Sequence, residues 1–182
     1  VAVFSNYSLL KNYNKIEFPK NKKIINFRIL KNPIIDTIKS SFSGTTPTLY
    51  EHKAIKKSNG CNKKLFVEDF SLALELSKFG NFCFIDNLTS FGPKDDENRI
   101  MNNKKTQLIH DYNAALYYFV KNNSQLNSRA KIIACKKAIG RTNKWAIRNS
   151  KANFLNKMLL LRIFLSSGIT NYIYFLRQSC LY

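Results

Sequence analysis

The sequence predicts a mainly α protein, with a small helical core, a long extended N-terminal arm and a C-terminal extension. Apolar residues make up 45% of the 182 residues, which is enough for a real core. They recur at helical spacing after residue 65, whereas residues 1–60 lack any long apolar periodicity. We therefore divide the chain into a basic, largely irregular arm over 1–64 and a helical core with a basic C-terminal region over 65–182.

The arm contains one expected strand. Residues 24–30 combine Ile, Phe and Leu and are stopped by Pro33, which has no N–H to donate to a sheet. The Ser, Gly, Thr and Pro residues of 41–47 predict a loop, and 58–60 predict a turn.

A helix is expected over 66–79, because Phe66, Phe70 and Leu74 recur every four residues. Its first turn is acidic, its last turn contains Lys78, and Gly80 follows. That order suits the helix dipole and a C-terminal glycine cap. Residues 86–103 are expected to form a polar loop.

The clearest helical pattern covers 104–121. Its apolar residues form one continuous stripe, which predicts a core-facing helix. The stripe consists of Leu108, Ile109, Tyr112, Ala115, Leu116, Phe119 and Val120.

A second long helix is expected over 143–165, after a polar insertion at 122–130 and a short apolar or extended piece at 131–133. Basic residues spaced 3, 4 and 3 apart would share one face: Arg141, Lys144, Arg148 and Lys151. A neighbouring apolar face would contain Ile147, Phe154, Met158, Leu161 and Leu165. One face can then enter a core while the adjacent one meets phosphates.

The charge of +19 is unevenly distributed. Residues 1–64 carry 13 basic and 3 acidic groups, 65–111 carry 5 and 8, and 112–182 carry 12 and none. An acid-free C-terminal third favours packing against phosphate, where each carboxylate would repel the partner. A solvated basic surface is the alternative interpretation.

A membrane is the competing anionic partner. The longest uncharged late run, 163–176, has 14 residues and includes Ser, Thr and Asn, whereas a spanning helix needs roughly 20 mostly apolar residues. We expect this run to be a buried helix or strand, with a surface-bound amphipathic segment as the alternative. The basic, acid-poor first 35 residues resemble both the region next to an organellar transit peptide and the arm of a nucleic-acid-binding protein.

Strong catalytic signatures are missing from the sequence, which contains no G-x-G-x-x-G, P-loop or H-E-x-x-H motif. None of the four cysteines forms a C-x-x-C pair, so free buried thiols are expected. A metal site at 95–97, a zinc site from scattered Cys and His, and a pairing of Cys135 with His52 or His110 are the alternatives considered. We expect no enzyme, no catalytic residue, no metal and no cofactor.

Residues 108–161 resemble the small-subunit ribosomal protein eighteen family of bacterial and organellar ribosomes. The matching features are the Leu-x-x-Phe-aliphatic pattern at 116–120, the small-Lys-aliphatic-aliphatic run at 130–133, the basic pair before Gly140, and the Ala-Ile-basic sequence at 146–148. Relative to that family, residues 122–129 include an insertion, and about 100 residues before the match and 20 after it are extensions.

A second resemblance is to small-subunit ribosomal protein fourteen. It rests on a Cys before a Gly-Arg pair, a later Arg-x-x-x-Ser-x-Gly run and a basic terminus with Ser and an aromatic residue. The corresponding residues are Cys135, Gly140, Arg141, Arg162, Ser166, Gly168, Arg177, Ser179 and Tyr182.

Both resemblances imply a structural constituent of the mitochondrial ribosomal small subunit, located in the matrix, with a core that binds ribosomal RNA. The expected partners are ribosomal RNA and neighbouring ribosomal proteins, without a small-molecule substrate or a membrane. The residues expected to bind RNA are Lys131, Lys136, Lys137, Arg141, Lys144, Arg148 and Lys151. Two other functions are considered: an accessory subunit of an organellar membrane complex that uses 158–176, and a small nucleic-acid enzyme.

Overall fold

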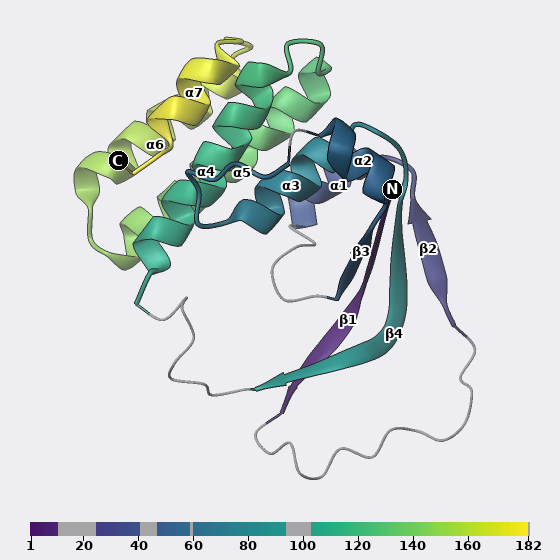
Figure 1. Ribbon diagram of the computed structural model, residues 1–182. Helices are drawn as coiled ribbons and strands as arrows, with labels where there is room; N and C mark the ends of the chain where they lie inside the picture. The colour runs from purple at the N-terminus through teal and green to yellow at the C-terminus, as the bar shows by residue number, and fades with distance from the viewer. Residues whose placement is uncertain (11–24, 41–46, 59, 94–102, 182) are drawn as a thin grey trace.

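A helical body joined to a four-stranded mixed sheet forms the protein (Figure 1). The computed structural model describes residues 1–10, 25–40, 47–58, 60–93 and 103–181. The mainly α prediction is therefore wrong, and the fold is α/β. The elements in chain order are β1 (Ala2–Leu10), β2 (Phe27–Leu30), α1 (Pro33–Ser40), β3 (Thr48–Tyr50), α2 (His52–Lys57), α3 (Glu68–Leu76), β4 (Phe82–Pro93), α4 (Lys105–Asn122), α5 (Ser128–Arg148), α6 (Ala152–Ser166) and α7 (Tyr172–Gln178).

The long extended arm is the second part of the fold-class prediction that the structure corrects. β1 lies inside the sheet, where it pairs with β4 in parallel and with β3 in antiparallel orientation. α1 packs against α5 in the helical body. β1 and β4 lie about 80 residues apart in the sequence, so no local pattern reveals the pairing that makes residues 2–10 a strand. Of the four strands, only β2 was expected. Of the loop predicted over 41–47, only the last residue belongs to the described residues.

The sheet has the strand order β2-β4-β1-β3. At the start of the central strands β1 and β4, every second residue is buried on one face, where Phe4, Phe82 and Phe84 meet Ala54 of α2 and Leu76 of α3. Residues opposite one another on paired strands share a face of the sheet. The other face therefore carries a row across all four strands, Ile29, Cys83, Val3 and Leu49, whose outer members Ile29 and Leu49 are 55% and 74% exposed.

A bulge in β4 bends the sheet. Ser5 lies opposite Ile85 but Asn6 lies opposite Leu88, so Asp86 and Asn87 are extra residues on β4. Polar contacts hold the bulge, since the Asn6 side chain donates to the Asp86 carbonyl (2.7 Å) and the Asn87 side chain accepts from the Asn26 backbone N–H (2.8 Å).

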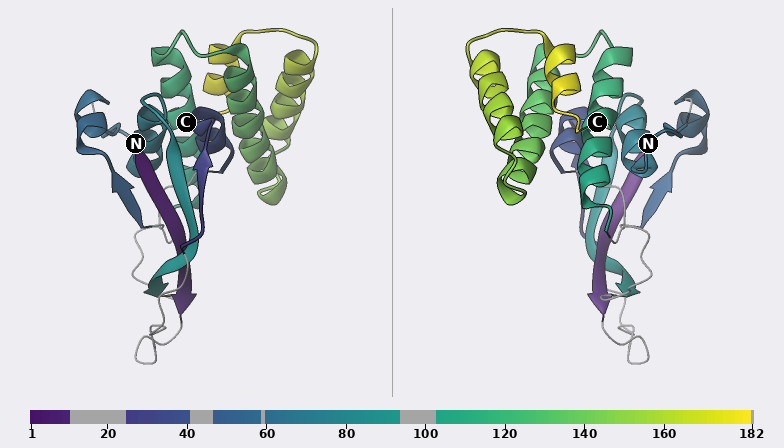
Figure 2. Two further views of the ribbon diagram at one scale, coloured as in Figure 1. Left: turned by 90° about the vertical axis from the view of Figure 1, so that its right-hand side faces the viewer. Right: turned by 90° about the vertical axis from the view of Figure 1, so that its left-hand side faces the viewer.

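The loop prediction for 86–103 is thus wrong over 86–93, because the polar residues of that stretch belong to the bulge and to the strand that continues beyond it. Residues 94–102 lie outside the described part of the chain. Figure 2 shows the distal halves of β1 and β4 projecting away from the helices.

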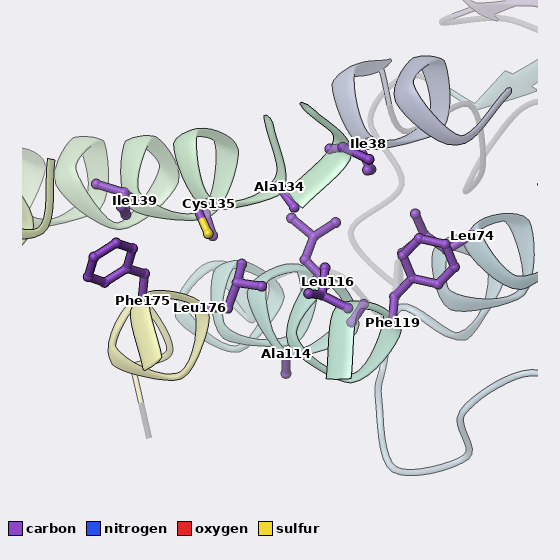
Figure 3. Packing of buried hydrophobic residues seen from close by; sticks show 14 of the residues in the cluster. Ile38, Leu74, Ala114, Leu116, Phe119, Ala134, Cys135, Ile139, Phe175 and Leu176 are labelled. Atoms are coloured by element: carbon purple, nitrogen blue, oxygen red, sulfur yellow. The ribbon is translucent and has the colours of Figure 1, made fainter. Parts of the chain in front are cut away.

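The main core lies between the helices. The predicted helices at 66–79 and 104–121 are confirmed as α3 and α4, and the expected stripe of α4 is buried at Leu116 and Phe119. The predicted end of α3 is wrong, because the helix stops at Leu76 with Ser77 as its C-cap, before Lys78 and Gly80. Figure 3 shows side chains of α5 pointing toward those of α4 and α7. α1 and α3 close the other end of this cluster through Ile38 and Leu74.

α5 is longer than expected at its start and shorter at its end. Residues 131–133 lie inside this helix, which begins at Ser128 because the Asn127 side chain accepts from the Ala130 backbone N–H (2.8 Å). The helix predicted over 143–165 is interrupted, because Ser150 has a φ of 52° and the Lys151 N–H donates to the Ala146 carbonyl (2.9 Å). This is a Schellman ending with Ser in the position that glycine normally occupies, so the sequence contains no glycine signal.

α6 packs at the edge of the helical body, against α5 (Figure 2). Its inward side buries Met158 and Leu161, while Leu159, Leu160, Ile163 and Phe164 are exposed. The run 163–176 is helical at both ends, as expected, but it is buried only at Phe175 and Leu176, and Ile163 is 61% exposed. Within the described residues, no helix combines the length and the apolar character needed to cross a membrane.

Candidate nucleic-acid interface

The seven basic residues expected to bind RNA fall into two groups in the structure. Lys131, Lys137 and Arg141 are half-buried and bond to other parts of the chain. The other four are exposed, namely Lys136, Lys144, Arg148 and Lys151.

Arg141 lies between helices rather than on the surface. Its guanidinium lies over the rings of Tyr112 (4.9 Å to the centroid) and Phe70 (5.8 Å), and its Nη1 donates to the Tyr112 carbonyl at 3.4 Å. Burial lowers the pKa of Arg141 to about 10. This side chain therefore joins α3, α4 and α5.

Two lysines tie α5 to neighbouring segments. Lys131 Nζ donates to the Ser124 carbonyl (2.7 Å), and Lys137 Nζ donates to the Lys39 carbonyl at the end of α1. The pKa of Lys137 is lowered, first by burial and then by the charges of Arg141, Lys144 and Lys39. The positive charges around Lys137 thus repel one another, and an anionic partner would relieve that repulsion.

The exposed cations of α5 form a row. Lys136, Lys144 and Arg148 occupy a spacing of eight and four residues, which places them along one ridge of the helix with Gly140 between them. Lys151 comes after the break and is the N-cap residue of α6. In the part of the chain that the structure describes, none of these four cations contacts a carboxylate.

A groove of about 440 Å³ runs beside this row, between α5 and α6. Three cations line it, two from the row and one from α6. Its remaining lining is mostly apolar. The lining residues are Lys136, Ile139, Gly140, Asn143, Lys144, Met158, Leu159, Arg162, Leu165 and Ser166.

Two features of the groove were not predicted from the sequence. Arg162 comes next to Lys144 and Lys136 only because the chain reverses at Ser150, so helical spacing alone did not connect them. Asn143 has a buried side-chain oxygen, Oδ1, that accepts no hydrogen bond from the described residues. A sequence carries no signal for such an unsatisfied acceptor.

Asn113 on α4 fixes how α5 is rotated. Its buried Nδ2 donates to Thr142 Oγ1 (2.9 Å), to the Ser179 carbonyl (2.8 Å) and to the Ala138 carbonyl (3.3 Å). These bonds join α4, α5 and the end of α7. They keep the Thr142 side of α5 inward and thereby turn the basic row outward.

The cysteines lie outside the basic row and the groove; all four are free, as expected, but only Cys135 is buried and the other three are half-buried. Cys135 is buried, donates to the Tyr172 carbonyl at 3.6 Å, and has its pKa raised by burial to about 12. Burial also raises the pKa of Cys180 to about 11, so both stay protonated at neutral pH. Within the described residues no group of three or more His, Cys, Asp and Glu side chains could hold a metal ion, and 95–97 lie outside those residues.

Comparison with protein-family models, with curated proteins and with solved structures finds no match to this chain.

Proposed function

We propose that this protein is a structural, non-catalytic RNA-binding component of the small subunit of a mitochondrial ribosome, located in the matrix. It binds ribosomal RNA through the basic row on α5 and packs against neighbouring ribosomal proteins. The observation that carries the proposal is the acid-free region 112–182, which contains all the cations of the row.

The exposure of these cations supports the proposal. Eight of the twelve basic residues in 112–182 are exposed, and five of them are in or next to α5. From Lys136 to Arg148 the row extends over roughly 18 Å of helix, at 1.5 Å per residue. Lys and Arg spread over that length neutralise several phosphates without reading the base sequence.

The core supports it as well. Arg141 is held between the helices by Tyr112 and Phe70. The four exposed cations in and next to α5 contact no carboxylate among the described residues, so their charge is available to a partner. The basic pair before Gly140 and the Ala-Ile-basic sequence, which carry the resemblance to ribosomal protein eighteen, lie on this same helix, as does the Gly140-Arg141 pair of the second resemblance. Several RNA-facing cations on one rigid helix suit binding to a fixed RNA surface.

Sedimentation tests this function. A tagged full chain, expressed in its own mitochondria and released with detergent, should migrate with small-subunit particles in a sucrose gradient. Ribonuclease should shift it to the top of the gradient, because its main partner is RNA. Migration that ignores ribonuclease would contradict the proposal.

A second candidate function is an accessory subunit of an organellar membrane complex. The specific observation in its favour is the outward face of α6, where Leu159, Leu160, Ile163 and Phe164 are exposed on a helix that also carries the cations Lys157 and Arg162. An apolar stripe flanked by cations is typical of a helix lying at a membrane surface. In the same gradient, this function predicts loss of the chain from small-subunit particles and migration with detergent-solubilised membrane complexes.

A further inference from the structure

The groove between α5 and α6 combines three chemical features. Its floor is apolar, with Ile139, Met158 and Leu165. Its lining also includes Lys136, Lys144 and Arg162, which together place three positive charges around one small cavity. The third feature is Asn143 Oδ1, a buried acceptor without a donor among the described residues.

Gly140 lines this groove without adding a side chain to it. It lies in the middle of α5, and a Cβ built on it would meet no atom within 4 Å. Packing does not therefore require glycine at this position. Glycine makes a helix interior less stable than alanine does, so the lack of a side chain at this position has a cost in helix stability.

We propose that the groove binds one unpaired RNA nucleotide, with the base on the apolar floor and its phosphate against the cations. This inference rests on the proposed RNA-binding function and adds the form of RNA that the site takes. Aromatic bases have apolar faces, and every base offers an N–H group that can donate to Asn143 Oδ1 when that side chain rotates to expose the atom, which is buried in this structure. A nucleotide thus brings an apolar base face to the floor, a phosphate to the cations and an N–H donor to the Asn143 side chain.

The size and charge of the groove favour this occupant. Its volume of about 440 Å³ falls in the lower part of the range of about 300–1,000 Å³ for small-ligand pockets. An apolar peptide side chain would leave three cations without anionic partners. A paired base is stacked within a helix and cannot enter, so the groove should discriminate between single-stranded and duplex RNA.

Filling the groove tests the proposal. Gly140→Leu adds a side chain to the space without changing any charge, and Gly140→Ala is the matched control that leaves most of the space open. The full-length chain would be titrated with a short single-stranded RNA and with a duplex RNA of equal length at one salt concentration. We expect Gly140→Leu to weaken single-strand binding about tenfold, because the base loses its apolar contact with the floor of the groove, and to leave duplex binding unchanged.

Asn143→Leu provides an independent second variant, because it removes the acceptor while keeping the size of the side chain. It should also weaken single-strand binding selectively. Circular dichroism would establish that both variants fold. Equal affinities of Gly140→Leu and Gly140→Ala for single-stranded RNA would overturn the proposal, as would an equal loss for duplex and single strand.

The outcomes separate this proposal from the proposed function. A wild-type chain that binds neither RNA in a salt-dependent way contradicts the RNA-binding function itself. A wild-type chain that binds both, with no effect of Gly140→Leu, contradicts only the nucleotide groove. The last comparison uses vesicles that contain an anionic phospholipid. If Gly140→Leu lost binding to these vesicles but kept its binding to RNA, the groove would bind a lipid phosphate and the proposal would be overturned.

Discussion

Asn113→Ala should reveal how strongly one buried amide holds the helical body together. The wild-type side chain is fully buried and donates two short bonds, to Thr142 Oγ1 and to the Ser179 carbonyl, and a longer one to the Ala138 carbonyl. The alanine variant loses all three. Because the end of α7 is bonded to α4 through this amide, its contact with α4 should loosen first.

The size of the effect can be worked out from these bonds. Each of the two short bonds contributes about 1 kcal/mol net to stability. Thr142 Oγ1 loses a donor in a buried position, although its own hydroxyl still donates to the Ser179 carbonyl. Together with the small cavity left behind, the free energy of unfolding should fall by about 2–4 kcal/mol.

Urea unfolding followed by circular dichroism would measure this change. Asn149→Ala is the matched control, since Asn149 lies at the end of α5 and makes a side-chain bond to the Trp145 carbonyl (2.8 Å), but is exposed. The control should lose at most about 0.5 kcal/mol. If both variants lost the same small amount, the buried amide would not hold α7 in place and our account of the orientation of α5 would be wrong.

Three further predictions concern stability. Phe119→Ala should lower the free energy of unfolding by about 3–5 kcal/mol, because the ring is buried in the core cluster; a loss below about 1 kcal/mol in the same urea assay would contradict its burial. Gly140→Ala should raise the thermal midpoint, by the equivalent of about 0.5–1 kcal/mol, since its Cβ meets open space; a lower midpoint would show that the space is not open. Burial lowers the pKa of His110 below its usual 6.5, and its Nδ1 accepts from the Leu181 N–H (3.2 Å). The unfolded chain therefore binds the proton more readily, so stability should be fully present above about pH 6.5 and fall as the pH drops below it. His110→Asn should flatten that decline, and an identical pH profile for variant and wild type would refute it.

Sequence periodicity predicted the parts of the fold whose partners are local. The apolar stripe of α4 and the acidic start of α3 are each a pattern within a single helix, and both helices lie where they were expected. The sheet was missed because β1 and β4 acquire their hydrogen bonds from segments far apart in the chain. Strand propensity depends on such packing more than helix propensity does.

The candidate site was predicted only in part, because helical spacing describes a single helix and not the contacts that it makes with its neighbours. Spacing correctly put Lys144 and Arg148 on one ridge of a helix, but it could not show that Arg141 stacks on Tyr112 instead of facing outward. The break at Ser150 was hidden because a serine occupies a position where glycine is the usual signal. Consequently the groove, which exists only because α6 folds back on α5, was not predicted.

The salt dependence of RNA binding tests the central claim most directly. In the double variant Lys144→Gln and Arg148→Gln, two exposed cations of the row are lost while the buried side of α5 is unchanged. Each phosphate contact releases counterions, so the slope of log affinity against log salt should decrease in magnitude by about 1–2 units. Lys56→Gln with Lys57→Gln, at exposed positions of α2, removes the same charge from another surface and should change the slope less. Wild-type affinity and slope in the α5 variant, with its fold intact by circular dichroism, would contradict the claim that this row binds RNA.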